Sequence, residues 1–129
     1  MEDWKKEAID WVAERIDLFV DLLPFVRIYT VKWFKRKSNP EGGWLAVSYS
    51  PYVFHATFYV YSGVLDEVPV VDGERVLSDG WKRYVDYGIA HEVGHLLTWD
   101  LYGDEEKKEK TASMIGSIIA NLVWKLEGK

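Results

Sequence analysis

The chain has 129 residues, which suits one domain over residues 1–129, and its 48% hydrophobic and 29% charged side chains are typical of a globular protein. The net charge of −5 argues against nucleic acid as a partner, because a phosphate backbone attracts basic proteins. Cysteine is absent, which excludes disulfides and thiolate metal ligands, and the chain shows neither a signal peptide nor an apolar segment of the ~20 residues that span a bilayer.

The first predicted element is an amphipathic helix over residues 3–23. Its apolar side chains recur at helical spacing, charged residues fill the other face, and Pro24 follows where the pattern stops. Residues 25–34 are rich in β-branched and aromatic side chains and predict a strand. Residues 38–43 carry the Ser, Asn, Pro and Gly typical of a turn, so the first strand is expected to end before them.

Two more strands are predicted over residues 44–49 and 53–61. In the second of these, alternate side chains should face opposite sides of the sheet. One set is expected in the core and consists of Phe54, Ala56, Phe58 and Val60. The other set mixes aromatic rings with polar groups, as a partly hydrated cleft would, and consists of His55, Thr57, Tyr59 and Tyr61.

The C-terminal half is predicted to hold two helices after a long connection over residues 63–80. Ser78 or Asp79 can cap the first helix, which runs from about residue 80 to 99, and Asp104 can cap the last one. The order of one helix, three strands and two further helices predicts an α+β fold, with a small mixed or antiparallel sheet under helices.

Residues 91–95 read His-Glu-Val-Gly-His, the HExxH pattern, and lie within the predicted helix of residues 80–99. Two histidines four residues apart lie one turn above each other on a helix, so both imidazoles can reach one ion. Glu92 lies one step round the helix and can accept a proton from water at that ion. The pattern therefore predicts a zinc site held by His91 and His95, with Glu92 as the general base.

A third protein ligand is expected, because a catalytic zinc ion usually takes three such ligands and a water. It must be a carboxylate, or else His55, and the downstream candidates are Asp100, Asp104, Glu105, Glu106 and Glu109. Asp100 lies too close to the motif along the chain, whereas Glu106 lies on a different helix face. Glu109 begins a stripe of small residues that let a second helix approach, namely Ala112, Ser113 and Gly116. Glu109 is therefore the predicted ligand, with Glu105 as the alternative.

Together these features resemble the gluzincins, zinc peptidases with HExxH on one helix and a ligand Glu on a following helix. Residues 109–113 read Glu-Lys-Thr-Ala-Ser and are similar to a short ligand signature, Glu-x-x-Ala followed by Asp, Asn or Ser. CAAX prenyl peptidases and phage-repressor-cleaving peptidases carry Asp or Asn at the last position, where Ser113 can still accept a hydrogen bond from a ligand histidine. In size and element order the chain is most similar to the soluble minigluzincins of archaea.

The resemblance implies a zincin-like core with Zn²⁺ as its cofactor. In such a core the last strand before the metal helix, here residues 53–61, forms the rim of the cleft and pairs with an extended substrate. Further residues that could stabilise the developing oxyanion are His55, Tyr59, Tyr61 and Tyr102.

The resulting hypothesis is a cytoplasmic zinc metallopeptidase that hydrolyses peptides or unfolded proteins, without a membrane or nucleic-acid partner. The absence of Gln and Cys, with plentiful Glu and Lys, favours a thermophilic source. One alternative is a peptide deformylase, although that class resembles a site with a cysteine ligand, which this chain lacks. The other alternative is a non-catalytic interaction protein with a structural or vestigial zinc site.

Overall fold

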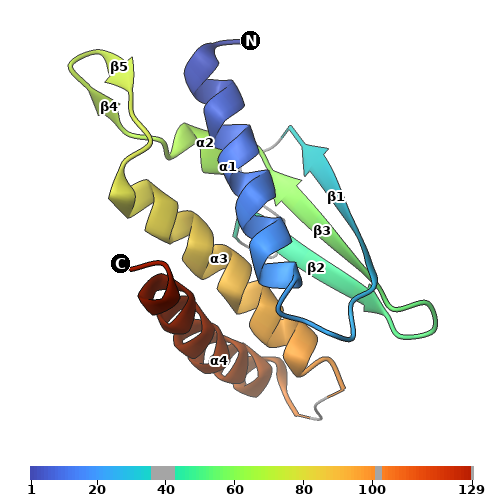
Figure 1. The fold of residues 1–129 in the computed structure, drawn as a ribbon. Coiled ribbons are helices and arrows are strands. Elements are labelled where there is room, and N and C mark those ends of the chain that lie inside the picture. Colours follow the sequence, from blue (N-terminus) through green and yellow to red (C-terminus); the bar gives the residue numbers. More distant parts are fainter. Residues whose placement is uncertain (36–42, 101–102, 129) are drawn as a thin grey trace.

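The computed structural model describes residues 1–35, 43–100 and 103–128. Its elements in chain order are α1 (Asp3–Val20), β1 (Ile28–Phe34), β2 (Leu45–Ser50), β3 (His55–Tyr61), α2 (Gly63–Asp66), β4 (Val70–Val71), β5 (Glu74–Arg75), α3 (Asp79–Leu97) and α4 (Glu105–Leu126) (Figure 1). The predicted α+β class is confirmed, and so are the three long helices and three main strands. Within the described ranges, no helix is long and apolar enough to cross a membrane.

The segment predicted as a plain connection over residues 63–80 contains α2 and the β4–β5 hairpin in addition. Asp72 and Gly73 form the two-residue turn of this hairpin, and both have positive φ, 53° and 80°. Asp-Gly is favoured in such turns because Gly adopts positive φ freely and Asp tolerates it.

A three-stranded mixed sheet forms one layer of the fold, with β3 in its centre. β1 pairs with β3 in parallel and β2 pairs with it antiparallel, so β1 and β2 are the two edges. One face of β3 presents Ala56, Phe58 and Val60, which are fully buried in the core as predicted. Phe54 was wrongly placed in that core set: it precedes the strand with a φ of 56° and is exposed.

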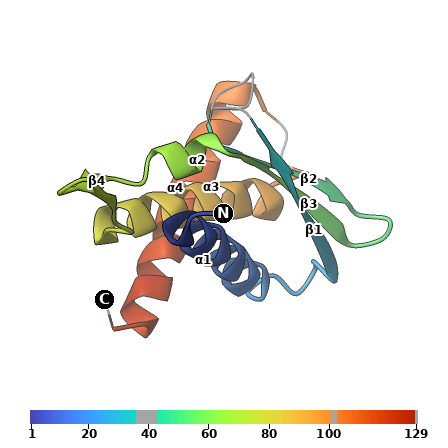
Figure 2. The same cartoon turned by 90° about the horizontal axis from the view of Figure 1, so that it is seen from above.

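The other face of β3 points away from the helices, and no described helix covers it (Figure 2). His55 Nε2 lies 2.8 Å from Thr30 Oγ1 on this face, and the ring of Tyr59 stacks on Phe34. The prediction that this side of the strand lines a cleft is therefore wrong. The expected substrate strand is corrected as well, because β3 is paired on both sides and only an edge strand can accept another chain.

Helices α3 and α4 approach each other closely, because small residues face each other at two points. A Cβ atom added to Gly94 would lie 2.4 Å from the carbonyl oxygen of Ala112, and one added to Gly116 would lie 2.7 Å from that of Ala90. The predicted stripe of small residues on α4 is thus confirmed as a helix-packing surface. Its consequence is that the first turns of α4 lie beside the last turns of α3.

A buried ionic cluster ties three helices together at the other end of α3. The Arg15 guanidinium of α1 donates two hydrogen bonds of 2.8 Å to the Asp86 carboxylate of α3, and it also pairs with Glu127 after α4. Trp124 Nε1 donates a further bond of 2.8 Å to Asp86. Asp86 is therefore fully hydrogen-bonded in the core, which fixes how α4 lies on α3.

Candidate metal centre

Helix α3 presents the HExxH residues because its beginning and its apolar face are well defined. The hydroxyl of Ser78 accepts a hydrogen bond of 3.1 Å from the backbone N–H of Trp81, as expected of an N-cap residue. Ile89, Val93 and Leu96 are buried in the core. The side chains of residues 91, 92 and 95 then face the other way and remain only half-buried.

Three side chains from two helices meet at this point. The Nε2 atoms of His91 and His95 lie 3.1 Å apart. The carboxylate of Glu109 on α4 contacts both, with Oε2 at 2.9 Å from His91 Nε2 and Oε1 at 3.0 Å from His95 Nε2. Asp104 accepts a 2.7 Å hydrogen bond from the N–H of Lys107 and so caps α4, which begins just before Glu109.

The spacing of these atoms fits a small metal ion. Ligands of a tetrahedral zinc ion, each ~2.0–2.1 Å from the metal, lie about 3.3 Å from one another. The two histidine nitrogens lie 3.1 Å apart, and they lie 2.9 and 3.0 Å from Oε2 and Oε1 of Glu109, each distance only a few tenths of an ångström shorter. His91, Glu92 and His95 also offer ligand atoms within 4.8 Å of one another. The His91–Glu92–His95 group could therefore hold a metal ion.

Ser113 orients one of the imidazoles. Its Oγ lies 3.1 Å from Nδ1 of His91, on the side of the ring that faces away from Glu109. When Nδ1–H donates to this hydroxyl, the Nε2 lone pair of His91 is free for a metal. Ser113, which stands in place of an Asp or Asn, is thus within reach of the hydrogen bond that its hydroxyl can still accept.

Burial sets the charge of the acidic and basic groups around the centre. Burial, and then the nearby charge of Glu109, raises the pKa of Glu92 to about 8 in the metal-free chain. Burial is also the main cause that lowers the pKa of His95, which outweighs the opposite effect of Glu109. A neutral imidazole is the form that binds metals, so the environment of His95 suits that role.

The residues of the candidate centre line a cleft of about 600 Å³ between β2 and the two helices. β2 contributes Leu45, Ala46 and Val47 to its wall. Trp99 and Lys108 also line it, and sequence reasoning missed both. The available signal for Lys108 was its place directly before the predicted ligand. The ring of Trp99 contacts that of Tyr49 on β2, with the centroids 5.7 Å apart and the planes tilted by 55°. Among the described residues, β2 is the free sheet edge that faces this cleft.

The remaining candidate residues lie elsewhere or have other contacts. Glu105 lines the cleft, but its carboxylate is 4.0 Å from the Lys108 amine and is largely exposed. Glu106 pairs with Lys110 at 3.2 Å, away from the histidines. His55, Tyr59 and Tyr61 are absent from the cleft lining, and Tyr102 lies outside the described residues. Among the described acids proposed as third ligand, the two histidine contacts belong to Glu109.

Comparison of the chain with protein-family models, with curated proteins and with solved structures returned no match. The resemblance to gluzincins therefore stays a prediction.

Proposed function

We propose that the protein is a zinc-dependent peptidase that hydrolyses extended peptide segments within a zincin-like core. The observation that carries this proposal is the contact of one carboxylate, that of Glu109, with the Nε2 atoms of both motif histidines at 2.9 and 3.0 Å. Two imidazoles and one carboxylate form the ligand set of several hydrolytic zinc enzymes, in which a fourth position stays open for water.

In this proposal His91, His95 and Glu109 hold the metal, and Ser113 keeps His91 in the required tautomer. When bound, zinc acts as a Lewis acid and lowers the pKa of water at the site to about 7. The donor set favours zinc over magnesium and calcium, because two imidazoles with a single carboxylate suit zinc, whereas those two ions prefer oxygen ligands. Metal binding would replace the protons shared among these groups in the metal-free chain.

Glu92 is the general base in this mechanism. A carboxylate oxygen of Glu92 lies within 4.8 Å of the histidine nitrogens, but it makes no hydrogen bond to them of the kind that Glu109 makes. A neighbouring cation favours the carboxylate form of Glu92 over the acid, which opposes the rise in its pKa. Glu92 can then take a proton from the attacking water and deliver it to the amine that leaves.

β2 is the proposed substrate-binding strand. The N–H of Tyr61 donates to the carbonyl of Trp44 at 2.8 Å, which makes these residues a hydrogen-bonded pair at the start of the ladder. Bonded and non-bonded pairs alternate in an antiparallel ladder, so the backbone groups of Leu45, Val47 and Tyr49 point to the free edge. A peptide that adds as a further strand can bond to them with little regard to its sequence, which suits unfolded substrates.

The test compares the wild-type protein with Glu92→Gln and His95→Ala on a library of unstructured peptides. We expect wild type to bind one zinc per chain and to cut peptides in a chelator-sensitive manner. Glu92→Gln should keep the zinc and lose hydrolysis, because a general base typically contributes ~10²–10⁴-fold. His95→Ala should lose both. If wild type and Glu92→Gln are equally active or equally inactive at matched zinc content, the peptidase proposal fails. An inactive protein that keeps its zinc would support the interaction-protein alternative.

A further inference from the structure

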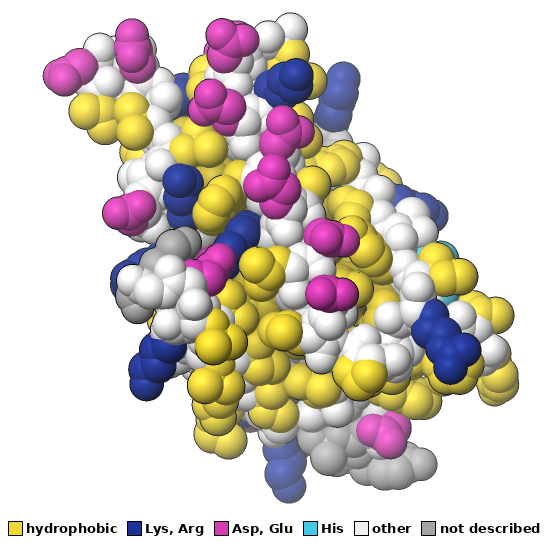
Figure 3. Space-filling model, in the orientation of Figure 1, with side chains coloured by type: hydrophobic (Ala, Val, Ile, Leu, Met, Phe, Trp, Pro, Cys, Tyr) yellow, Lys and Arg dark blue, Asp and Glu magenta, His cyan; other side chains and the backbone are white. Residues whose placement is uncertain are grey.

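We propose that the exposed face of α4 binds a second copy of the chain and forms a two-fold symmetric dimer beside the metal cleft. α4 uses one face to pack on α3, through Ala112, Gly116 and Ala120. Its opposite face carries large apolar side chains at every fourth position, namely Met114, Ile118, Leu122 and Leu126. Hydrophobic side chains gather over α4 in the space-filling view (Figure 3). These four residues are called the α4 stripe below.

The composition of α4 sets this face apart from the rest of the surface. Charged residues make up 29% of the chain, yet residues 111–124 contain none. Met114, Ile118 and Leu122 are nevertheless 66%, 59% and 55% exposed. An amphipathic helix that lies on a lipid surface carries Lys or Arg along its polar flank. The flank here consists of Ser113, Ser117 and Asn121, with a single lysine, Lys125, at the helix end, which favours a protein partner over a membrane.

The exposed area is sufficient for a modest interface. With about 200 Å² for each fully exposed side chain, the α4 stripe presents roughly 500 Å², near the upper end of apolar patches on monomers. Two such stripes, with their polar flanks, would bury somewhat more than ~1,000 Å², the lower bound for a specific interface. The stripe therefore fits a partner of similar size, and an interface near this lower bound is typical of weak, transient association.

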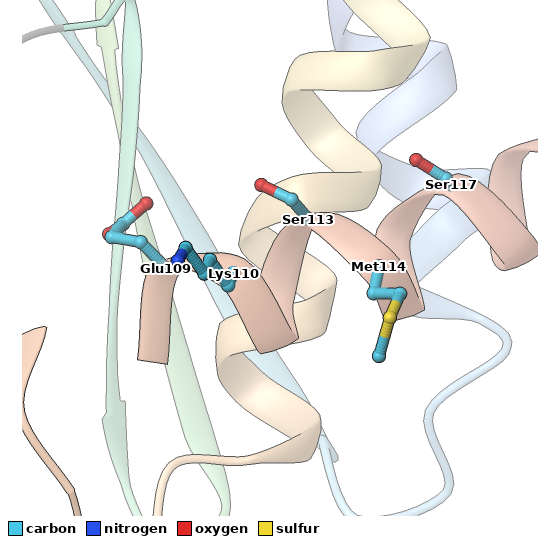
Figure 4. Close-up of a pocket in the computed structure, with 5 residues that line it drawn as sticks. All are labelled: Glu109, Lys110, Ser113, Met114 and Ser117. Atoms are coloured by element: carbon cyan, nitrogen blue, oxygen red, sulfur yellow. The ribbon is translucent and has the colours of Figure 1, made fainter. Parts of the chain in front are cut away.

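The shape of the face fits a copy of itself. The row of large side chains runs next to a parallel row of short ones, Ser113, Ser117 and Asn121, all exposed. Figure 4 shows Ser113 and Ser117 directed to one side of α4 and Met114 to the other. In helix packing, a ridge of residues four apart fits into the groove beside an equivalent ridge, at a crossing of about −50°. A two-fold interface requires such self-complementarity.

The proposed interface also adjoins the candidate metal centre. A shallow hollow of about 440 Å³ runs along α4 and is lined by Glu109, Lys110, Ser113, Met114 and Ser117 (Figure 4). Glu109 lines both this hollow and the metal cleft. A copy seated on Met114 and Ser117 would thus form an outer wall beside the cleft. This consequence for activity rests on the proposed function, whereas the dimer itself does not.

The dimer is tested by sedimentation of the full chain from low micromolar to near-millimolar concentration. We expect the mean mass to rise from monomer to dimer with concentration for wild type. Ile118→Lys should remain monomeric throughout the range. Val53→Lys is the matched control, because Val53 is also β-branched, is 57% exposed and lies on the distant β2–β3 loop. It should dimerise as wild type does, and circular dichroism shows whether each variant is folded.

Two variants of Ser117 distinguish a specific, complementary interface from non-specific hydrophobic association. Ser117→Phe adds apolar area but fills the groove, so it should weaken the dimer, whereas a non-specific patch would associate more strongly. The chain has no cysteine, so Ser117→Cys provides a single thiol near the two-fold axis. Its oxidation should yield a disulfide-linked dimer in high yield, and Ser48→Cys, exposed on the sheet, should not.

A wild-type protein that stays monomeric at the highest concentration would overturn the proposal, and so would a monomer that binds lipid vesicles instead. If the dimer persists in Ile118→Lys, or if Val53→Lys disrupts it to the same extent, the interface lies elsewhere on the molecule. These outcomes are read from mass alone, so they are independent of zinc content and peptidase activity. A failure of the proposed function would leave them unchanged.

Discussion

The contact between α3 and α4 leads to a sharp prediction for Gly94→Ala. The added Cβ would meet the Ala112 carbonyl oxygen at 2.4 Å, whereas ordinary contacts of this kind are 3.4 Å or longer. The obstacle is backbone, which cannot rotate aside as a flexible side chain can. α4 must therefore move by about 1 Å relative to α3, which is overpacking of a close-packed interior.

The cost can be worked from this displacement. Overpacking destabilises by ~1–3 kcal/mol, and a backbone clash belongs at the upper end of that range. Replacing Gly by Ala within a helix raises the free energy of unfolding by up to ~1 kcal/mol, because Ala has the higher helix propensity. The net loss of stability is therefore about 2 kcal/mol. In a chain of this length, such a loss lowers the melting temperature by roughly 8 °C.

The same displacement should weaken the metal site. A shift of about 1 Å moves the Glu109 carboxylate from 2.9–3.0 Å to nearly 4 Å from the histidine nitrogens, beyond the ligand spacing of a zinc ion. Zinc affinity should fall at least ~10-fold, the lower end of the effect of disturbing the groups that support metal ligands. Competition with a chromophoric chelator measures this affinity, and thermal melts with and without zinc measure the stability.

Gly80→Ala is the matched control in the same helix. A Cβ at Gly80 meets only the Ser78 hydroxyl, at 3.8 Å, so it causes no clash. This variant should bind zinc normally and be unchanged or slightly more stable, because Ala loses less backbone entropy than Gly. If Gly94→Ala melts and binds zinc as Gly80→Ala does, the close approach of the two helices is refuted, together with the reason given for the position of Glu109.

Three further predictions concern individual charges. Glu109→Gln should weaken zinc binding strongly in calorimetric titration, whereas Glu106→Gln should leave it unchanged. The reason is that the Glu109 carboxylate contacts the histidines and that of Glu106 pairs with Lys110. The opposite ranking would reject Glu109 as a ligand. The chelated protein should lose stability as pH rises from about 4.5 to 8, because the folded state holds the Glu92 proton to a higher pH than the unfolded chain does. Urea unfolding of metal-free Glu92→Gln should lack this slope, and an equal slope in both proteins would assign it to another group. Arg15→Met should lower the free energy of unfolding by ~3–5 kcal/mol at pH 7, because it leaves the buried Asp86 carboxylate without its counter-ion. Adding Asp86→Leu should recover part of this loss. No recovery in the double variant would show that the loss comes from packing alone.

Local patterns predicted the helices and the main strands well, because each depends on residues close together in the chain. Ser78 and Asp104 cap α3 and α4, as their positions before apolar periodic segments indicated. The expected burial of Ala56, Phe58 and Val60 also follows from strand alternation. The β4–β5 hairpin was missed, although Asp72-Gly73 was a readable turn signal between two short apolar pairs.

Long-range pairing was the source of the errors. Alternation in residues 53–61 separates two faces, but it does not state which face meets the helices or which strands lie on either side. The polar and aromatic face, with His55 and Tyr59, could equally line a cleft or an uncovered sheet surface. The order β1-β3-β2 made β3 central and moved the free edge at the cleft to β2. That order arises because each residue of β1 pairs with a residue of β3 that lies 27 positions later, a pairing that local sequence does not reveal.

The sequence by itself determined that His91, Glu92 and His95 share one region of a helix, because 3.6 residues per turn relates these positions without any tertiary contact. It also narrowed the third ligand to two acids on one stripe of α4. Which of the two lies against the histidines required the tertiary structure, since Glu109 and Glu105 differ by one helical turn and either carboxylate is chemically suitable as a ligand. Helix α4 lies so that Glu109 reaches both imidazoles because Gly94 and Gly116 let the two backbones meet, and because Arg15, Asp86 and Trp124 hold the far ends together. Those contacts join residues 18 to 71 positions apart, and only the folded chain brings them together.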